Sequence, residues 1–144
     1  MKRINQYING NGYIYSYEEL SNFYLSLKTK PFVILAGISG TGKSKLVRLF
    51  AESINAKFKS IPVKPDWNDS TELLGYKNIK DEFVKGELYK VIDEAKEHLD
   101  TPYFVCLDEM NLARVEYYLS EYLSVIESRK FETDKIVTDK LFSE

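Results

Sequence analysis

Hydrophobic and polar positions alternate along this chain in two different patterns. Apolar residues three and four positions apart predict amphipathic helices over residues 17–27, 43–53, 88–99 and 115–128. Short continuous apolar runs predict buried strands at residues 32–35, 57–63 and 103–107. Because these strands and helices follow one another in turn, we expect an α/β fold with a parallel sheet flanked by helices.

The first of these helices carries its own start signal. Ser16 precedes the helix, and Glu19 follows three positions later, which is the spacing of a capping box. In that motif the hydroxyl accepts a hydrogen bond from a free backbone N–H, while the carboxylate reaches back to the cap residue. The helix is therefore expected to begin at Tyr17.

The remaining segments have weaker patterns. Residues 1–12 are rich in Asn and Gly, and we expect them to form a flexible N-terminus. Residues 65–87 begin with a proline and predict a long loop with a helical turn near residues 71–74. Trp67 in this loop is more consistent with packing there than with contact to another subunit or DNA. Residues 130–144 are charged and predict one or two short strands.

Composition narrows the class of protein. At 144 residues with 44% hydrophobic and 29% charged side chains, the chain is a folded domain rather than a disordered or fibrous one. The net charge of -2 includes no long basic run, so we expect DNA contact only through other domains. Cys106 is the only cysteine and cannot form an internal disulfide. With no signal segment or membrane-spanning run, a cytoplasmic location without membrane contact is expected.

Residues 37–44 carry the most specific motif of the chain. The run Gly37-Ile38-Ser39-Gly40-Thr41-Gly42-Lys43-Ser44 matches G-x-x-x-x-G-K-[ST] between a predicted strand and a predicted helix. Backbone N–H groups of such a loop wrap phosphates, and glycine allows the required dihedrals and close approach. Both the matched positions and the flanking elements disfavour a chance glycine-rich turn. The candidate nucleotide contacts are Gly37, Ser39, Gly40, Thr41, Gly42, Lys43 and Ser44.

Within this loop two side chains have distinct predicted roles. Lys43 would reach the β- and γ-phosphate oxygens, and the Ser44 hydroxyl would ligate Mg²⁺. The second group of candidates is the acid pair Asp108 and Glu109, which directly follows the apolar run at residues 103–107. Asp108 would hold Mg²⁺ through its water shell, and Glu109 would orient the attacking water as the catalytic residue. The alternative for this pair is two solvated acids at a strand end.

Together these motifs resemble a known family. The phosphate loop, the acid pair and the helix behind it are similar to the AAA+ superfamily of P-loop NTPases, in the dynein-related branch that contains McrB-type restriction GTPases and MoxR-type ATPases. That branch carries D-E-I-N-R-A where this chain has Asp108-Glu109-Met110-Asn111-Leu112-Ala113-Arg114. Asp, Glu, Asn and Ala match in register. Leu112 occupies the position of the family arginine, and Arg114 lies two places on.

The resemblance implies an AAA+-like P-loop fold, with residues 13–144 as a partial nucleotide-binding core. By comparison with the family, the chain is expected to stop before the sensor-1 strand, the arginine finger and the helical lid. On its own, the 144-residue chain is then expected to bind nucleotide weakly, turn it over slowly and form no closed ring.

For the complete protein, the resemblance implies Mg²⁺-dependent hydrolysis of ATP or GTP by a ring-forming, McrB-like motor. A neighbouring subunit would supply an arginine, and the motor would drive a partner nuclease or remodel a target protein. Two alternatives stay open: a nucleotide-binding assembly module with negligible turnover, and a MoxR-like chaperone ATPase. The choice between ATP and GTP is open as well.

Overall fold

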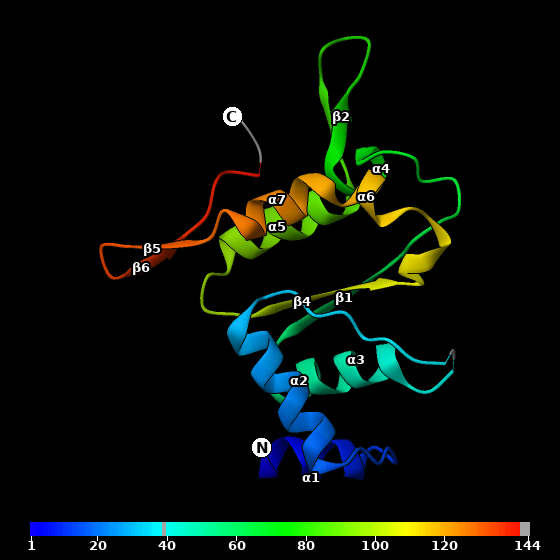
Figure 1. The fold of residues 1–144 in the computed structure, drawn as a ribbon, viewed down its shortest axis with the longest axis vertical. Helices are drawn as coiled ribbons and strands as arrows, with labels where there is room; N and C mark the ends of the chain where they lie inside the picture. Colours follow the sequence, from blue (N-terminus) through cyan, green and yellow to red (C-terminus); the bar gives the residue numbers. More distant parts are fainter. Residues whose placement is uncertain (39, 142–144) are drawn as a thin grey trace. The chain divides into compact units, whose positions relative to one another are not determined.

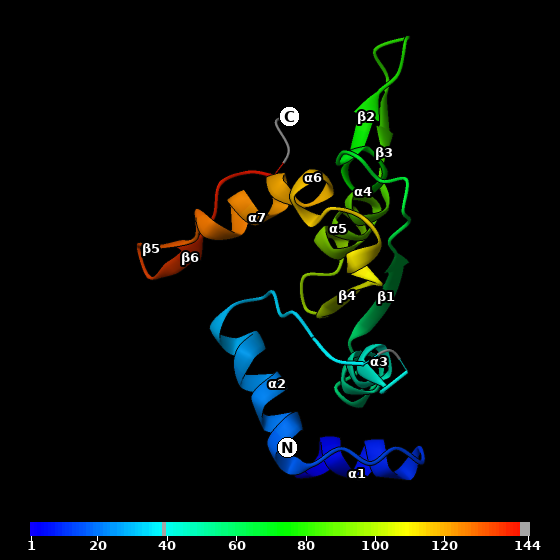
Figure 2. The ribbon, with the colours of Figure 1, turned by 45° about the vertical axis from the view of Figure 1, so that its right-hand side comes forward.

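The computed structural model describes residues 1–38 and 40–141, and its helices and strands are drawn in Figures 1 and 2. Ser39 and residues 142–144 lie outside the described residues. The chain divides into two compact units. The first unit comprises Met1–Lys59 and His98–Cys106, and the second comprises Ser60–Glu97 and Leu107–Glu144.

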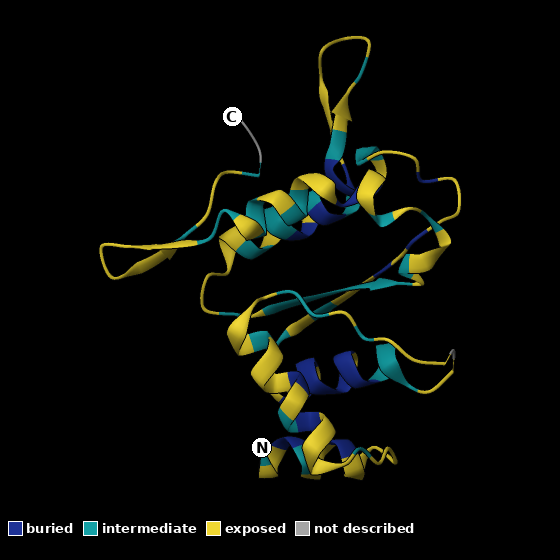
Figure 3. Ribbon diagram, in the orientation of Figure 1, coloured by how far each residue is buried: buried dark blue, intermediate teal, exposed yellow. Residues whose placement is uncertain are grey.

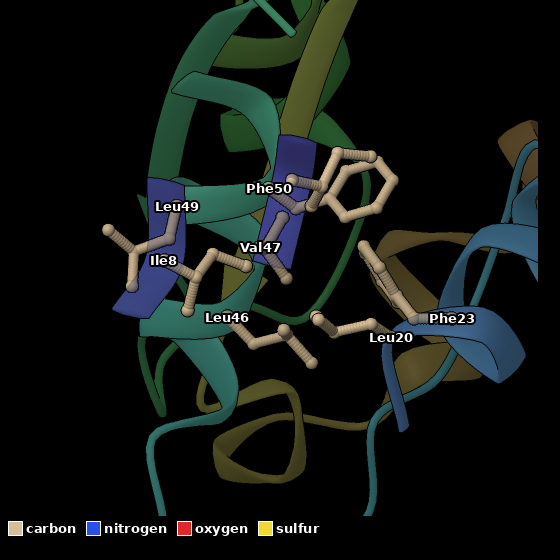
Figure 4. Packing of buried hydrophobic residues seen from close by; sticks show 8 residues of the cluster. Ile8, Leu20, Phe23, Leu46, Val47, Leu49 and Phe50 are labelled. Atoms are coloured by element: carbon tan, nitrogen blue, oxygen red, sulfur yellow. The ribbon is translucent and has the colours of Figure 1, made fainter. Parts of the chain in front are cut away.

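A helical core holds the first unit together. It is built by α1 (Lys2–Gly10), α2 (Tyr17–Thr29) and α3 (Lys43–Ser53). The buried side chains of this core are Ile4, Ile8, Leu20, Phe23, Leu46, Val47, Leu49 and Phe50. Figure 3 shows the buried stretch of α3, and Figure 4 shows side chains of the three helices directed toward one another. The rings of Phe23 and Phe50 meet edge to face, with their centroids 5.0 Å apart.

The first helix corrects one expectation. We expected residues 1–12 to lack regular structure, but Lys2–Gly10 form α1. Ile4 and Ile8 lie one helical turn apart and are both buried in the core, which stabilises a helix in an otherwise polar segment. A domain boundary at residue 13 stays a prediction.

The capping box predicted for α2 is confirmed. The Glu19 backbone N–H donates to Ser16 Oγ at 3.1 Å, and the Ser16 N–H donates to Glu19 Oε2 at 2.7 Å. These hydrogen bonds from Ser16, the backbone one foremost, lower the pKa of the Glu19 carboxyl. The helix begins at Tyr17 as expected and continues to Thr29.

Two short strands form a parallel pair. It consists of β1 (Lys57–Pro62) and β4 (Tyr103–Asp108), as the apolar runs predict. The Lys57 N–H donates to the Pro102 carbonyl and the Val63 N–H to the Asp108 carbonyl, both at 2.9 Å, so both strands run in the same direction.

The prediction of a strand at residues 32–35 is wrong. The segment has no regular secondary structure and joins no sheet in the described part of the chain. Val33 and Leu35 pack against the core of the first unit, whereas Ile34 is 67% exposed. An apolar run signals burial, but a strand also needs a hydrogen-bonding neighbour, and the sequence pattern does not reveal whether one exists.

In the second unit, the loop expected at residues 65–87 contains a β-hairpin that the sequence analysis did not predict. The predicted helical turn is present as α4 (Thr71–Leu74). It leads into β2 (Gly75–Lys77) and β3 (Phe83–Lys85), which pair antiparallel and are followed by α5 (Glu87–Glu97). Most of the hairpin is exposed, as the yellow ribbon in Figure 3 shows.

Two glycines lie at the base of this hairpin, where neighbouring backbone segments pack closely. A Cβ on Gly75 would lie 2.4 Å from the Val84 carbonyl oxygen. A Cβ on Gly86 would lie 2.5 Å from the Leu73 carbonyl oxygen. At the same base, Lys85 forms an ion pair with Asp93 of α5, and the Lys85 hydrogen bond lowers the pKa of the Asp93 carboxyl.

The helix predicted over residues 115–128 is interrupted. It forms α6 (Val115–Tyr118) and α7 (Ser120–Glu127), with Leu119 between them at φ −119°. Tyr118 and Leu119 are adjacent and both buried, so a bend between the helices lets both side chains face inward. A 3₁₀ turn, η1 (Met110–Leu112), precedes them.

The expectation that Trp67 packs within the protein is confirmed. Its ring is 6% exposed and meets the Tyr118 ring edge to face at 5.4 Å between centroids. The Tyr118 hydroxyl donates to the Met110 carbonyl at 3.1 Å, which ties α6 to the turn behind β4. The aromatic pair thus links residue 67 to the segment that follows Asp108.

The charged tail contains the two short strands expected there. They are β5 (Lys130–Glu132) and β6 (Lys135–Val137), which pair antiparallel. Thr133 and Asp134 join them with φ of 48° and 63°, the dihedral signs of a type I′ turn. None of the helices in the described ranges is both long and apolar enough to cross a membrane.

Candidate functional site

The phosphate-loop motif leads directly into α3. Gly42 is the cap residue of the helix at φ 85° and ψ 13°, and Lys43 and Ser44 are its first two residues. Non-glycine residues rarely adopt this left-handed conformation, so glycine is favoured at position 42. The structure therefore brings Gly37, Gly40, Thr41, Gly42, Lys43 and Ser44 together at the start of α3. Ser39, the remaining predicted contact, lies outside the described residues.

The electrostatic field at this helix end favours an anion. None of the described side chains caps α3, and its first turn has no acidic residue. Free N–H groups and the helix dipole together give a helix N-terminus a partial positive charge. Lys43 and Lys45 add full charges in the same turn. Phosphate binding at this end is consistent with all of these contributions.

The Lys43 side chain forms hydrogen bonds with the backbone of its own loop. Lys43 Nζ donates to the carbonyl oxygens of Gly37 at 3.0 Å and Ile38 at 2.7 Å. Thr41 Oγ1 also donates to the Ile38 carbonyl, at 2.8 Å. A phosphate that engages Lys43 would replace these carbonyl oxygens as its hydrogen-bond acceptors.

A cavity of about 400 Å³ opens beside the loop in the first unit. Its lining residues are Tyr15, Glu19, Phe23, Ile34, Leu35, Ala36, Thr41, Lys43 and Leu46. The volume is within the range of small-ligand pockets, and the lining combines apolar walls with a few polar groups. Because Lys43 and Thr41 also belong to the phosphate loop, a ligand held by its phosphates there would have room for a further part in this cavity.

Tyr15 is a site residue that the sequence analysis missed. Its hydroxyl donates to the Gly42 carbonyl at 2.9 Å, across 27 positions of sequence. Burial, followed by the nearby Tyr13 and Glu19, raises the pKa of this hydroxyl above its ordinary value of 10.0. No local motif connects a tyrosine between two helices with a distant loop, so the sequence held no signal for it.

The acid pair lies at the end of β4, in the second unit. Asp108 is the last residue of the strand, is half-buried and accepts the Val63 N–H on its backbone carbonyl. Glu109 is exposed and adopts φ 54° and ψ 45°, a left-handed conformation that is strained for a residue with a Cβ. That this pair and the loop act on one ligand stays a prediction.

The donor atoms suit the metal expected here. Ser44 offers a hydroxyl oxygen and Asp108 a carboxylate oxygen, both hard ligands of the kind that Mg²⁺ prefers. Mg²⁺ in phosphate-binding sites is held by one or two such protein ligands together with phosphate oxygens and water. Each of these two donor groups taken by itself therefore suits this ion, and their binding of one ion stays a prediction.

The arginine near the acid pair has an intramolecular partner. Arg114 Nη1 donates to the Tyr117 hydroxyl at 3.1 Å, and its guanidinium lies over the Tyr117 ring, 5.5 Å from the centroid. Leu112, at the position where the resembling family has arginine, is 45% exposed. Arg114 is thus held along the start of α6.

Comparison with known proteins assigns a family to most of the chain. The family described as "AAA domain (dynein-related subfamily)" matches residues 32–143. This range contains the phosphate loop, α3, the β1–β4 strand pair and the acid pair. No curated protein matches the chain.

Proposed function

The chain belongs to the dynein-related subfamily of AAA domains, and we propose that it binds a Mg²⁺-nucleoside triphosphate at residues 37–44. AAA domains generally hydrolyse nucleoside triphosphates and commonly assemble into rings. The observation that carries the proposal is the start of α3, which bears Lys43, follows the left-handed Gly42 and is capped by none of the described side chains. That arrangement, within a family match, is suited to phosphates and to few other ligands.

Binding would reorganise the loop around its lysine. Lys43 exchanges the Gly37 and Ile38 carbonyls for β- and γ-phosphate oxygens, and the start of α3 directs backbone N–H groups to the same ligand. Ser44 and Asp108 are the proposed ligands of Mg²⁺, which neutralises phosphate charge when bound. Gly37, Ser39, Gly40, Thr41 and Gly42 supply the backbone of the cradle.

Hydrolysis would depend on Glu109. Its strained backbone and exposed side chain suit a carboxylate that turns out of the strand end to meet a water molecule. The carboxylate accepts a hydrogen bond from that water and orients it toward the γ-phosphate. Glu109 is therefore proposed as the catalytic residue.

The finer assignment is a McrB-like motor. The run Asp108-Glu109-x-Asn111-x-Ala113 supports it, because it keeps the residues of that branch in register. In this proposal copies of the protein form a ring powered by ATP or GTP hydrolysis, and the ring drives a partner nuclease or remodels a protein. DNA would be contacted only by other domains, and the location would be cytoplasmic.

One observation favours a second candidate, a nucleotide-binding assembly module with negligible turnover. Leu112 replaces the family arginine, and Arg114 is engaged with Tyr117. If that arginine normally acts between subunits, its loss removes charge stabilisation from the reaction while leaving binding intact. A MoxR-like chaperone ATPase remains a third candidate within the hydrolase class.

Glu109→Gln tests the proposed catalysis. In an assembly that turns over nucleotide, we expect unchanged nucleotide affinity and a loss of phosphate release of about 10²-fold or more, because the amide keeps the shape but is a poor proton acceptor. Glu116→Gln, which changes an exposed acid of α6, is the matched control and should keep the wild-type rate. Turnover of Glu109→Gln within about twofold of wild type would remove Glu109 from this role, and a wild-type assembly without turnover would favour the module.

A further inference from the structure

One hydrogen bond joins the segment between α1 and α2 to the start of α3. The Tyr15 hydroxyl donates to the Gly42 carbonyl oxygen at 2.9 Å. The same oxygen accepts the first helical hydrogen bond of α3, from the Leu46 N–H at 2.8 Å. A carbonyl oxygen has two lone pairs, so these donors use both and hold the Gly42 carbonyl from two directions.

Holding this carbonyl also orients the next N–H group. The Gly42 carbonyl and the Lys43 N–H belong to one planar peptide unit, and cis peptide bonds are absent from the described residues. In a trans peptide the C=O and N–H bonds point in opposite directions. The Lys43 N–H must therefore point away from Tyr15 and Leu46, toward the open end of α3 where the phosphates are proposed to bind.

Tyr15 is well placed to fix this peptide. Its ring packs against the helical core of the first unit, so the hydroxyl is not carried on a freely moving side chain. The adjacent Tyr13 ring lies under Lys45 of α3, with Nζ 4.8 Å from the centroid, and anchors the same segment. Because the pKa of Tyr15 is raised, its hydroxyl remains a donor throughout the neutral pH range.

We infer that Tyr15 is a positioning residue of the phosphate loop: its hydroxyl orients the Gly42–Lys43 peptide so that the Lys43 N–H faces the bound phosphates. This inference rests on the proposed binding of a nucleoside triphosphate at residues 37–44. It assigns Tyr15 an effect on the phosphate part of the ligand, although its ring also lines the adjacent cavity.

The test compares two ligands and two tyrosines. Mg²⁺-tripolyphosphate carries only the phosphates, whereas Mg²⁺-ATP or Mg²⁺-GTP also carries the nucleoside. Tyr15→Phe removes the hydroxyl and keeps the ring, and we expect it to weaken both kinds of ligand by the same factor, about three- to tenfold in calorimetry. Tyr13→Phe is the matched control, because the Tyr13 hydroxyl has no hydrogen-bond partner among the described residues, and it should leave both affinities unchanged.

Several outcomes would overturn the inference. Unchanged affinity of Tyr15→Phe for both ligands would do so, even if the variant unfolds at a lower temperature, because a purely structural role predicts that result. A loss confined to the nucleoside triphosphates would instead make Tyr15 a contact of the nucleoside. A wild-type chain that binds neither kind of ligand would contradict the proposed function itself, and the inference would fail with it.

A spectroscopic measurement keeps the inference testable if Tyr15→Phe does not fold. In the wild-type chain, the Lys43 amide resonance and the Tyr15 ¹³Cζ resonance should both shift when Mg²⁺-tripolyphosphate is added. A shift at neither group under saturating ligand would overturn the inference. In a folded Tyr15→Phe variant, the Lys43 amide should already be shifted without ligand.

Discussion

Two regions of the molecule depend on different kinds of contact: the helical core of the first unit and the base of the β2–β3 hairpin in the second. In the first unit, side chains from three helices interlock in a core that contains the Phe23–Phe50 ring pair. In the second, the base of the β2–β3 hairpin relies on backbone approaching backbone at Gly75 and Gly86. A side-chain core tolerates changes of shape better than a backbone contact, which admits no added atom. The helical core of the first unit should therefore be sensitive to removed atoms, and the base of the hairpin to added ones.

The largest effect is expected from removing atoms in the first unit. Ile8→Ala deletes a fully buried side chain of α1 and should destabilise the protein by about 2 to 5 kcal/mol, because burial is lost and a cavity remains. Urea unfolding followed by circular dichroism measures the loss. Arg3→Ala, at an exposed position of the same helix, is the control and should change stability little. Equal stability of both variants would mean that α1 does not contribute to the core.

Adding one methyl group in the second unit should have the next largest effect. Gly86→Ala places a Cβ 2.5 Å from the Leu73 carbonyl oxygen, so the backbone must shift at a cost of about 1 to 3 kcal/mol. Trp67 is the only tryptophan and belongs to this unit, so its fluorescence follows the unfolding. Gly10→Ala, where a Cβ meets nothing within 4 Å, should be neutral or slightly stabilising. A neutral Gly86→Ala would remove the backbone contact from the comparison.

At Gly42 of the phosphate loop, an added Cβ would meet both an unfavourable backbone conformation and a neighbouring side chain. Gly42→Ala requires a left-handed alanine, and its Cβ would lie 2.8 Å from the Tyr15 hydroxyl. The conformation alone should cost about 1 to 2 kcal/mol, and displacement of Tyr15 should weaken nucleotide binding further. Gly12→Ala is a close control, because Gly12 has φ 81° and open space around it. Similar nucleotide affinity for Gly42→Ala and Gly12→Ala would contradict the role given to the Tyr15 contact.

The smallest effect is expected at the exposed start of α2. Ser16→Ala removes the cap and should destabilise the helix by about 1 kcal/mol.

The Glu19 pKa is lowered below 4.5 in the folded chain, so the contribution of the Glu19 carboxylate to stability is present at neutral pH and is lost as the pH falls through the folded value. The stability difference between wild type and Glu19→Gln should therefore shrink under acid titration. A difference that does not change below pH 4.5 would show that the capping box is not the cause.

The same contrast explains which elements could be predicted from the sequence. Periodic apolar positions define α2, α3 and α5 because each buries one face, and capping chemistry marks the start of α2 at Ser16. The β2–β3 hairpin was not predicted, since its strands are short and exposed and its base depends on backbone contacts. A strand was wrongly predicted for the apolar run at residues 32–35, because burial of Val33 and Leu35 does not require a sheet.

The candidate site divides in the same way. Local motifs predict Lys43, Ser44, Asp108 and Glu109 as site residues, because a phosphate loop and a strand-end acid pair are defined by neighbours in sequence. Tyr15 was missed because its contact with Gly42 is created by tertiary packing. The positive φ of Glu109 was also invisible, since a left-handed backbone has no marker in a residue other than glycine.

Nucleotide binding at the start of α3 is the central claim, and calorimetry with Mg²⁺-ATP and Mg²⁺-GTP tests it most directly. The wild-type chain should bind at least one of them, and Lys43→Ala should abolish that binding by removing the charge that offsets the phosphates. Lys45→Ala removes a neighbouring charge that lies over the Tyr13 ring, and it should retain most of the affinity. Equal affinity of wild type and Lys43→Ala, or a larger loss in Lys45→Ala, would contradict the proposed phosphate site.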